Sequence, residues 1–363
     1  MARLLLLTLV LIVYGSLYPW HLRAIPYGAN PLSIVLHAWP QQVDRGTIRD
    51  IAVNVLVYLP LGLFAFALLA ELLSTRVAVL LSVLVGLVLS TGVEVAQVFI
   101  EGRVPSLLDV ASDTAGTGIG GVAGVLWNRR RHGPLRRPDS DFLLCLWVLA
   151  QCFPFVPQLK ASFTVRSHAE DVLLFLAEAL SLVPIVRSLG RTERRSRAIL
   201  GVLLLLVPLK AFIYTRSVAL AEIVCSAVVF VGAFFVPLRA VVVVFLLAAA
   251  VVMRGLAPYH FLAVPHPFLW VPFQASLYSE WEAGLTIMLA KAFRYGALVW
   301  LIRESGVRLS VATALTVVPL AGIEAMQTLL PGRSSEIVDP LIALMIAWVF
   351  WSAGNASRVK IAA

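Results

Sequence analysis

Four polar residue types recur with one spacing at two distant places in this chain of 363 residues. Both places read Glu-x2-Gln-x5-Arg-x5-Asp: Glu94, Gln97, Arg103 and Asp109, and then Glu324, Gln327, Arg333 and Asp339. Carboxylates exchange protons or bind amines and hydroxyls, and arginine binds phosphate or carboxylate groups. Each copy lies where two long apolar stretches meet. Ionisable groups in such a position mark a functional site by default.

The first copy is predicted to gather its polar groups at one depth. Glu94 and Gln97 are three residues apart, so they share one face of a helix. Asp109 and Asp113 lie one turn apart on the next helix, which runs antiparallel to it. The other predicted members of the site are Asn54 in an earlier apolar stretch, Arg103 in the turn, and Ser106.

A structural interpretation of the same residues remains open. Ser106-x2-Asp109 is a capping-box pattern, and the helix dipole favours an acid in the first turn. Arg103 would then only neutralise Glu94. An acid inside an apolar stretch nevertheless normally faces a cavity or a partner, which favours a functional role for Glu94.

The second copy is more cationic than the first. Glu336 takes the position of Ser106, and Lys291 and Arg294 lie in the stretch where the first copy has Asn54. The two copies therefore either bind different groups, or one of them is a remnant.

The composition indicates a membrane protein. Hydrophobic residues make up 60% of the chain, charged residues only 13%, and the mean hydropathy is +0.91. Soluble domains hold about 45–50% apolar and about 25% charged residues, so a water-soluble enzyme is excluded. The net charge of +9 comes from basic residues in short loops, which is typical of membrane topology and not of nucleic-acid binding. The three cysteines lack metal-ligand spacing, and neither a metal nor a cofactor is expected.

Twelve apolar stretches approach the length of about 20 residues that crosses a bilayer. They fall into three sets: 3–20, 50–71, 76–99 and 106–127; 141–158, 168–189, 196–215 and 217–236; 238–256, 282–303, 308–330 and 335–352. The arginine clusters at 129–137 and 187–197 both fall in alternate loops, which places both termini in the cytoplasm. We therefore predict an all-α, polytopic transmembrane bundle of three four-helix repeats.

Five segments follow from this division. They are a first unit (1–127), a basic cytoplasmic linker (128–140), a middle unit (141–237), a further unit (238–352) and a cytoplasmic tail (353–363). The middle unit keeps Arg216 and Glu222 six residues apart, but no Glu-x2-Gln precedes them. We interpret it as a degenerate copy that supports the bundle.

A glycine-rich string lies inside the fourth apolar stretch. Gly116, Gly120 and Gly124 recur at steps of four, and no strand precedes them as a nucleotide-binding loop would require. The spacing predicts a small-residue face that packs against another helix.

Two motifs of the first unit resemble signatures of the VanZ-like family of bacterial membrane proteins. Residues 49–62, with Asn54 and Pro60-Leu-Gly62, resemble the signature of the family's second span. Glu94-x2-Gln97-x5-Arg103-x2-Ser106-x2-Asp109 resembles its third-to-fourth span signature. A weaker second likeness covers about 270–350 and departs at Lys291 and Glu336.

The resemblance implies a cell-envelope protein with a link to teicoplanin resistance, and it implies no reaction. We expect a multi-pass protein of the bacterial plasma membrane that binds or shields an outer-leaflet lipid, a lipid-linked cell-wall precursor or a lipoglycopeptide. One alternative is an intramembrane enzyme with Glu94 or Asp109 as general acid or base and Arg103 stabilising anionic charge. A second alternative is a transporter. The sequence does not set the oligomeric state.

Overall fold

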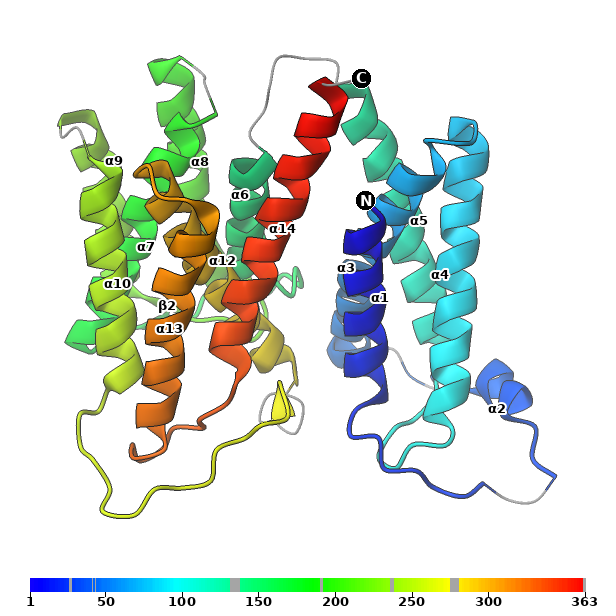
Figure 1. Cartoon of the computed structure of the whole chain (residues 1–363). Helices are drawn as coiled ribbons and strands as arrows, with labels where there is room; N and C mark the ends of the chain where they lie inside the picture. The colour runs from blue at the N-terminus through cyan, green and yellow to red at the C-terminus, as the bar shows by residue number, and fades with distance from the viewer. Residues whose placement is uncertain are drawn as a thin grey trace. The chain divides into compact units, whose positions relative to one another are not determined.

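The computed structural model describes residues 1–25, 28–40, 42, 44–130, 138–189, 192–235, 238–274 and 281–361. The architecture is all-α apart from one two-stranded parallel sheet, so the predicted all-α class is confirmed (Figure 1). The chain divides into two compact units, Met1–Leu135 with Pro154–Val156, and Arg136–Phe153 with Pro157–Ala363.

Each of the twelve predicted stretches coincides with a helix. The first set is α1 (Ala2–Leu17), α3 (Arg45–Leu69), α4 (Thr75–Gln97) and α5 (Leu107–Arg130). The middle set is α6 (Pro138–Cys152), α7 (Ala169–Arg187), α8 (Glu193–Leu209) and α9 (Leu220–Phe235). The third set is α10 (Ala240–Leu256), α12 (Trp281–Glu304), α13 (Leu309–Gln327) and α14 (Val338–Ile361). Shorter elements are α2 (Pro31–His37), η1 (Lys210–Phe212), β1 (Phe163–Thr164) and β2 (Val218–Ala219).

Local capping explains two differences between the predicted and the observed helices. Helix α3 begins five residues before the predicted start, because Asp44 accepts a hydrogen bond from the Thr47 amide at 2.8 Å and Thr47 caps it in return. The unpredicted helix α2 starts at Pro31, and the side chain of Asn30 accepts bonds from two amides of its first turn. Composition alone does not reveal these caps.

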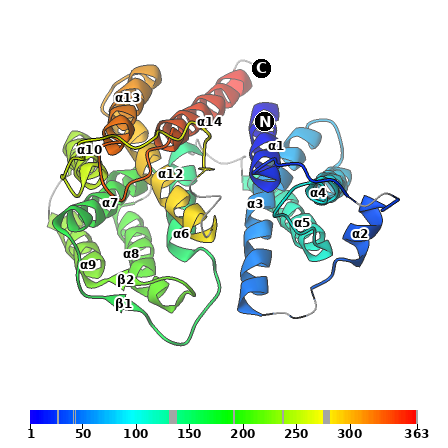
Figure 2. The ribbon, with the colours of Figure 1, turned by 90° about the horizontal axis from the view of Figure 1, so that it is seen from below.

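All three sets share one packing scheme. In the first set α1 packs against α3 and α4, and α5 packs against the same two helices. In the middle set α6 and α9 both pack against α7 and α8, and in the third set α10 and α14 both pack against α12 and α13. The second unit joins its two sets through contacts of α7 with α10 and of α6 with α12 (Figure 2). One apolar core that includes Leu182, Leu247 and Leu301 runs through both.

The glycine face of α5 packs directly on the backbone of α3, as predicted. A Cβ atom added at Gly120 would lie 2.0 Å from the carbonyl oxygen of Leu59, and one at Gly116 would lie 2.4 Å from that of Val55. Gly62 makes the reciprocal approach to the carbonyl oxygen of Thr117. Helices come this close only where a side chain is missing, which is the small-residue packing known from membrane helices.

Four helices among the described residues are long and apolar enough to cross a membrane: Arg45–Leu69, Thr75–Gln97, Gly284–Glu304 and Leu309–Gln327. Four shorter apolar helices are Ala2–Leu17, Leu220–Ala233, Ala240–Leu256 and Val338–Ala353. Helix α4 exposes a stripe of apolar side chains one turn apart, Leu80, Leu84 and Val88. Twelve spans with cytoplasmic ends stay a prediction. Residues 131–137 of the basic linker and residues 362–363 of the tail lie outside the described part of the chain.

Candidate functional site

Gln97 and Arg103 hold the C-terminal end of α1. The Gln97 side-chain amide donates to the Ser16 carbonyl at 2.9 Å. The Arg103 guanidinium donates from Nε to the Tyr18 carbonyl at 2.8 Å and from a terminal nitrogen to the Gly15 carbonyl at 3.0 Å. The last carbonyls of a helix have no partner within it, so these side chains satisfy groups that would otherwise be unpaired. We call this arrangement the helix-end clamp.

Glu94 holds the N-terminal end of α5. Its Oε2 accepts a hydrogen bond from the Ser106 amide at 2.7 Å, and its side chain is buried, with 3% of the residue exposed. The Ser106 hydroxyl accepts from the Asp109 amide at 3.4 Å, which is one half of the predicted capping box. The amide that Asp109 would bind in the other half is taken by Glu94. The Asp109 carboxylate is therefore not used by the cap.

A second group of polar side chains lies deeper, between α3, α4 and α5. The Ser90 hydroxyl donates to Asp113 Oδ2 at 2.6 Å, and Asn54 lies close to Asp109. Asp113 Oδ1 and the Tyr58 hydroxyl are buried and lie near each other, but neither has a partner in good hydrogen-bond geometry within the described part of the chain. We call Asn54, Tyr58, Ser90, Asp109 and Asp113 the acidic cluster. Across the described residues, no lysine or arginine forms an ion pair with either of its aspartates.

The predicted residues thus divide into two groups with different partners. Glu94, Gln97 and Arg103 bind backbone groups, whereas Asp109 and Asp113 face other side chains. Tyr58 and Ser90 were not among the predicted site residues. Their positions offered a signal, because Tyr58 follows Asn54 by one helical turn and Ser90 precedes Glu94 by one turn.

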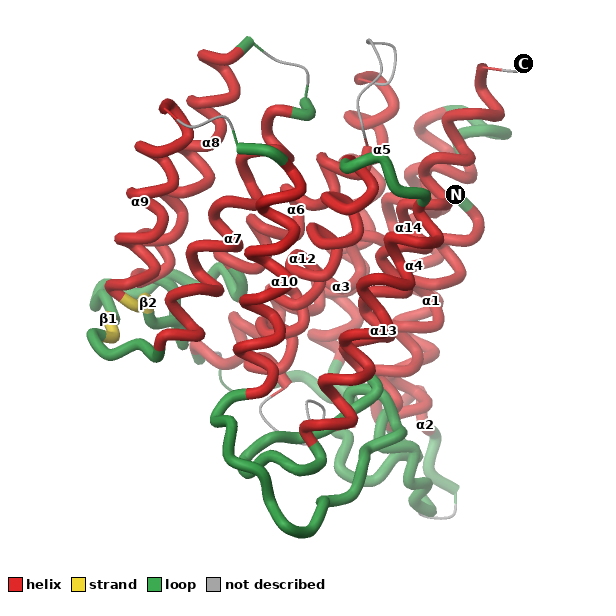
Figure 3. The backbone as a smooth tube through the Cα atoms, turned by 60° about the vertical axis from the view of Figure 1, so that its left-hand side comes forward, coloured by secondary structure: helices red, strands yellow, loops and turns green. Residues whose placement is uncertain are grey.

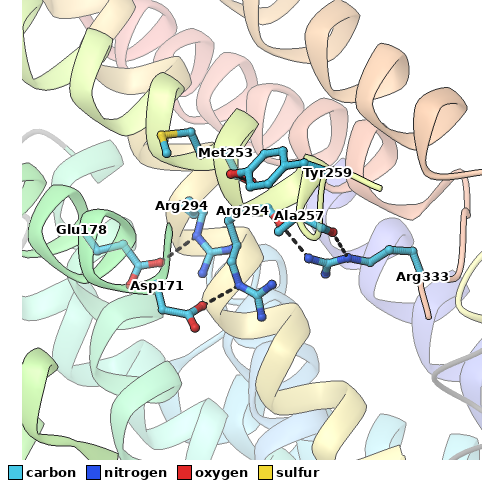
Figure 4. A network of polar contacts seen from close by, with 8 residues as sticks. All are labelled: Asp171, Glu178, Met253, Arg254, Ala257, Tyr259, Arg294 and Arg333. Atoms are coloured by element: carbon cyan, nitrogen blue, oxygen red, sulfur yellow. Dashed lines mark hydrogen bonds and ion pairs between the residues drawn. The ribbon is translucent and has the colours of Figure 1, made fainter. Parts of the chain in front are cut away.

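The second copy of the motif forms the same set of hydrogen bonds as the helix-end clamp of the first copy. Gln327 donates to the Gly255 carbonyl at 2.9 Å, and Arg333 donates at 2.9 and 2.8 Å to two further carbonyls near the end of α10 (Figure 4). Glu324 Oε2 accepts from the Glu336 amide at 2.8 Å. Position 336 therefore does not require a serine, because Glu324 binds only the backbone amide of that residue.

The two copies differ at the aspartate that ends the motif. Lys291 Nζ lies 2.5 Å from Asp339 Oδ1, and the Tyr295 hydroxyl donates to the other oxygen of Asp339. Asn54 and Tyr58 hold the corresponding places in the first set. The third set therefore supplies its own counter-ion, whereas the first set leaves its aspartates without one.

Two further arginines of the third set also form ion pairs. Arg294 Nε lies 2.7 Å from Glu178 Oε1, and Arg254 Nε lies 2.6 Å from Asp171 Oδ1 (Figure 4). Both pairs link the third set to helix α7 of the middle set. Lys291 and Arg294 are therefore local partners of acids.

Both clamp arginines lie in loops and stay charged. Burial lowers the pKa of Arg103, and the nearby Glu94 opposes that change. Burial also lowers the pKa of Arg333, and the neighbouring Arg254 lowers it further. An arginine starts so far above neutral pH that these changes do not remove its proton.

The clamp makes a prediction for Arg103→Lys. An ammonium group cannot reach both carbonyls in the planar geometry of a guanidinium, so one carbonyl loses its charged donor. We expect a loss of about 1–3 kcal/mol of stability. Thermal unfolding of the purified protein in detergent would measure it. The exposed Arg76→Lys is the matched control, and an equal unfolding temperature for both variants would show that the clamp contributes nothing.

Comparison with known proteins agrees with the resemblance seen in the motifs. Residues 2–128 match the VanZ/LLP1 family. This segment contains the helices, the clamp and the acidic cluster of the first set. No curated protein and no solved structure matches the chain.

Proposed function

We propose that this chain, whose first unit is VanZ-like, is a multi-pass protein of the bacterial plasma membrane that binds an envelope molecule through its acidic cluster. The ligand is an outer-leaflet lipid, a lipid-linked cell-wall precursor or a lipoglycopeptide. The apolar helices and the exposed apolar stripe of α4 support the membrane location. The arginine-rich loops support cytoplasmic termini, which puts the clamp end of the bundle at the outer leaflet.

One observation carries the proposal: the first set holds Asp109 and Asp113 without a cation, whereas Lys291 occupies the corresponding place in the third set. A buried carboxylate needs donors and a positive charge. Asp113 accepts from Ser90 and lies near the Tyr58 hydroxyl, but among the described residues its Oδ1 has no well-aligned donor and no cation pairs with it. A ligand that carries ammonium or sugar hydroxyl groups would supply them. Cell-wall precursors and lipoglycopeptides are rich in both.

The clamp residues then have a positioning role. Glu94 fixes the start of α5, which carries both aspartates, and Arg103 fixes α1 against the same end of the bundle. We further propose that residues 238–352 form a second VanZ-like unit, because the bonds of its clamp match those of the first. Its internal Lys291–Asp339 pair makes it a structural copy that does not bind the same ligand.

An enzymatic role has less support. Glu94 was one of the two candidates for a general acid or base, with Asp109, but its Oε2 is bound to a backbone amide. A general acid or base must reach the substrate's proton, which such a contact hinders. Binding needs only the groups that remain unpaired.

Co-purification of envelope lipids tests the proposal. The double variant Asp109→Asn/Asp113→Asn removes both negative charges but keeps the shape of the side chains. We expect bound lipid-linked precursor, measured by mass spectrometry of extracts of the purified protein, to fall at least about tenfold, as for loss of a charged hydrogen-bond pair. A host that depends on the protein for teicoplanin tolerance should become sensitive.

Glu101→Gln is the matched control, because Glu101 is an exposed acid in the loop next to the clamp. It should retain the same lipids as the wild type. Equal retention by the double variant and the control, at equal protein yield, would reject the proposal.

A further inference from the structure

The middle set carries a pocket that neither copy of the Glu-x2-Gln motif explains. It has a volume of about 350 Å³ and is lined by Thr164, Phe175, Lys210, Thr215, Arg216, Ser217, Ala219 and Glu222. Strands β1 and β2 contribute Thr164 and Ala219, and Figure 3 shows them beside the N-terminal end of α9. Two cations, one carboxylate and three hydroxyls therefore surround one space.

The lining charges occupy the motif positions of the other two sets. Counted from Arg216, Lys210 stands six residues before it, where the other copies have glutamine, and Glu222 stands six after it, where they have aspartate. The backbone confirms this register. In the first set the Arg23 amide donates to the Phe99 carbonyl at 2.7 Å, and in the middle set the Gln158 amide donates to the Phe212 carbonyl at 2.7 Å.

The turn that follows the first helix of each set supports the same register. It contains a proline followed by an aromatic residue with positive φ: Trp20, Phe155 and Tyr259, at 60°, 63° and 62°. Such a φ is uncommon for residues other than glycine, so a threefold recurrence at one place indicates one shared turn. The middle set is a third copy of the same architecture.

The helix-end clamp of the middle set, however, lacks some of the hydrogen bonds that the other two sets make. Arg216 donates from a terminal nitrogen to the Ala150 carbonyl at 2.7 Å, as Arg103 does to Gly15. Arg103 and Arg333 also donate from Nε to a second carbonyl, whereas Nε of Arg216 has no partner in the protein. Lys210 binds Glu222 and does not take over the helix-end contact that Gln97 makes in the first set.

These differences leave one guanidinium donor, Arg216 Nε, without a partner among the described residues, and a net positive charge beside the pocket. Lys210 and Glu222 neutralise each other, so the charge of Arg216 remains. We propose that the pocket binds a phosphate oxyanion, anchored by Arg216. Arginine suits this role because its guanidinium donates in a planar fork that matches phosphate oxygens. The hydroxyl groups of Thr164, Thr215 and Ser217 line the same pocket and can donate further hydrogen bonds to the phosphate.

The surroundings favour a lipid as the source of the phosphate. Large apolar side chains that adjoin lining residues in the sequence are exposed: Phe163, Val165 and Leu220. Exposed apolar groups around a polar pocket mark a lipid or partner site. A phosphodiester head group would enter the pocket while its acyl chains lie along these side chains. This inference does not depend on the acidic cluster of the first set.

Titration of the full-length protein in detergent tests the proposal. The probes are dioleoylphosphatidylglycerol, dioleoylglycerol as its phosphate-free counterpart, and inorganic phosphate, followed by native mass spectrometry and calorimetry. We expect the phosphatidylglycerol to bind more tightly than the dioleoylglycerol. Arg216→Gln should weaken its binding about tenfold or more, as for loss of a charged hydrogen bond.

Two further variants make the result specific. Glu222→Gln removes the repelling carboxylate and frees Lys210, so it should tighten binding several-fold without touching the Ala150 contact. The exposed Arg166→Gln, which removes a nearby charge outside the pocket, should leave binding unchanged. If Arg216→Gln does not fold, the Glu222→Gln result decides.

The results also distinguish a lipid head group from a soluble phosphate as the source of the oxyanion. Binding of inorganic phosphate that depends on Arg216, together with equal binding of both lipids, would support the oxyanion site and assign it to a soluble phosphate. Binding of phosphatidylglycerol that is the same in the wild type, Glu222→Gln and Arg216→Gln would overturn the proposal.

Discussion

Gly120→Ala is expected to destabilise the first unit strongly, whereas Gly118→Ala on the same helix is not. The new Cβ at position 120 would lie 2.0 Å from the Leu59 carbonyl oxygen, and backbone cannot move aside as a flexible side chain can. Helices α3 and α5 would have to separate along their whole contact. Overpacking typically costs about 1–3 kcal/mol and occasionally more, and a backbone clash belongs at the upper end.

Gly118 provides the matched control. Its added Cβ would meet only the Val83 side chain at 3.6 Å, which is an ordinary van der Waals contact. Alanine is favoured over glycine in a helix by about 1 kcal/mol, so this variant should be neutral or slightly more stable. Thermal unfolding of both variants in detergent makes the comparison. Similar unfolding temperatures would mean that the glycine face of α5 does not set the packing.

The glycine face was predictable because the information is local. A step of four residues places small side chains on one face of a helix, whatever the rest of the chain does. The twelve helices were predictable for the same reason, since long apolar runs need internal backbone hydrogen bonds. Borders such as Asp44 were missed because a cap depends on two or three polar residues just outside the apolar run.

The partners of the motif were not predictable from spacing. Glu94 and Gln97 do share a helical face, but spacing does not show which backbone groups lie opposite that face. The Ser16 carbonyl, which Gln97 binds, comes from a helix far away in sequence. A signal did exist, because the last carbonyls of every helix need donors and an arginine in a nearby loop is a common source.

The three sets of helices therefore have the same packing scheme but differ in the polar side chains around one acid. Clamp residues keep the helix ends together, and the position six residues after each arginine carries the acid that varies in its partners. Asp109 lies near Asn54, Glu222 pairs with Lys210, and Asp339 pairs with Lys291. The two counter-ions come from different places, Lys210 from η1 and Lys291 from α12, and the described part of the first set has none.

Lys291→Met tests how strongly the third set depends on its internal counter-ion. Asp339 has 8% of its side chain exposed, so the substitution would leave a buried carboxyl group with Tyr295 as its remaining donor. Breaking a buried ion pair by removing one partner costs about 3–5 kcal/mol. Lys291 keeps 29% of its side chain exposed, and we expect a loss near the lower end of that range.

A second substitution should restore most of this loss. In Lys291→Met/Asp339→Asn the charge is gone, and the asparagine oxygen still accepts from the Tyr295 hydroxyl. Arg197→Met is the matched control, because its pair with Glu193 is exposed, and such pairs contribute about 0–1 kcal/mol. Unfolding in detergent should therefore rank Lys291→Met well below the double variant and Arg197→Met. A single variant as stable as the double one would show that Asp339 needs no counter-ion, and the contrast between the third set and the acidic cluster would lose its physical basis.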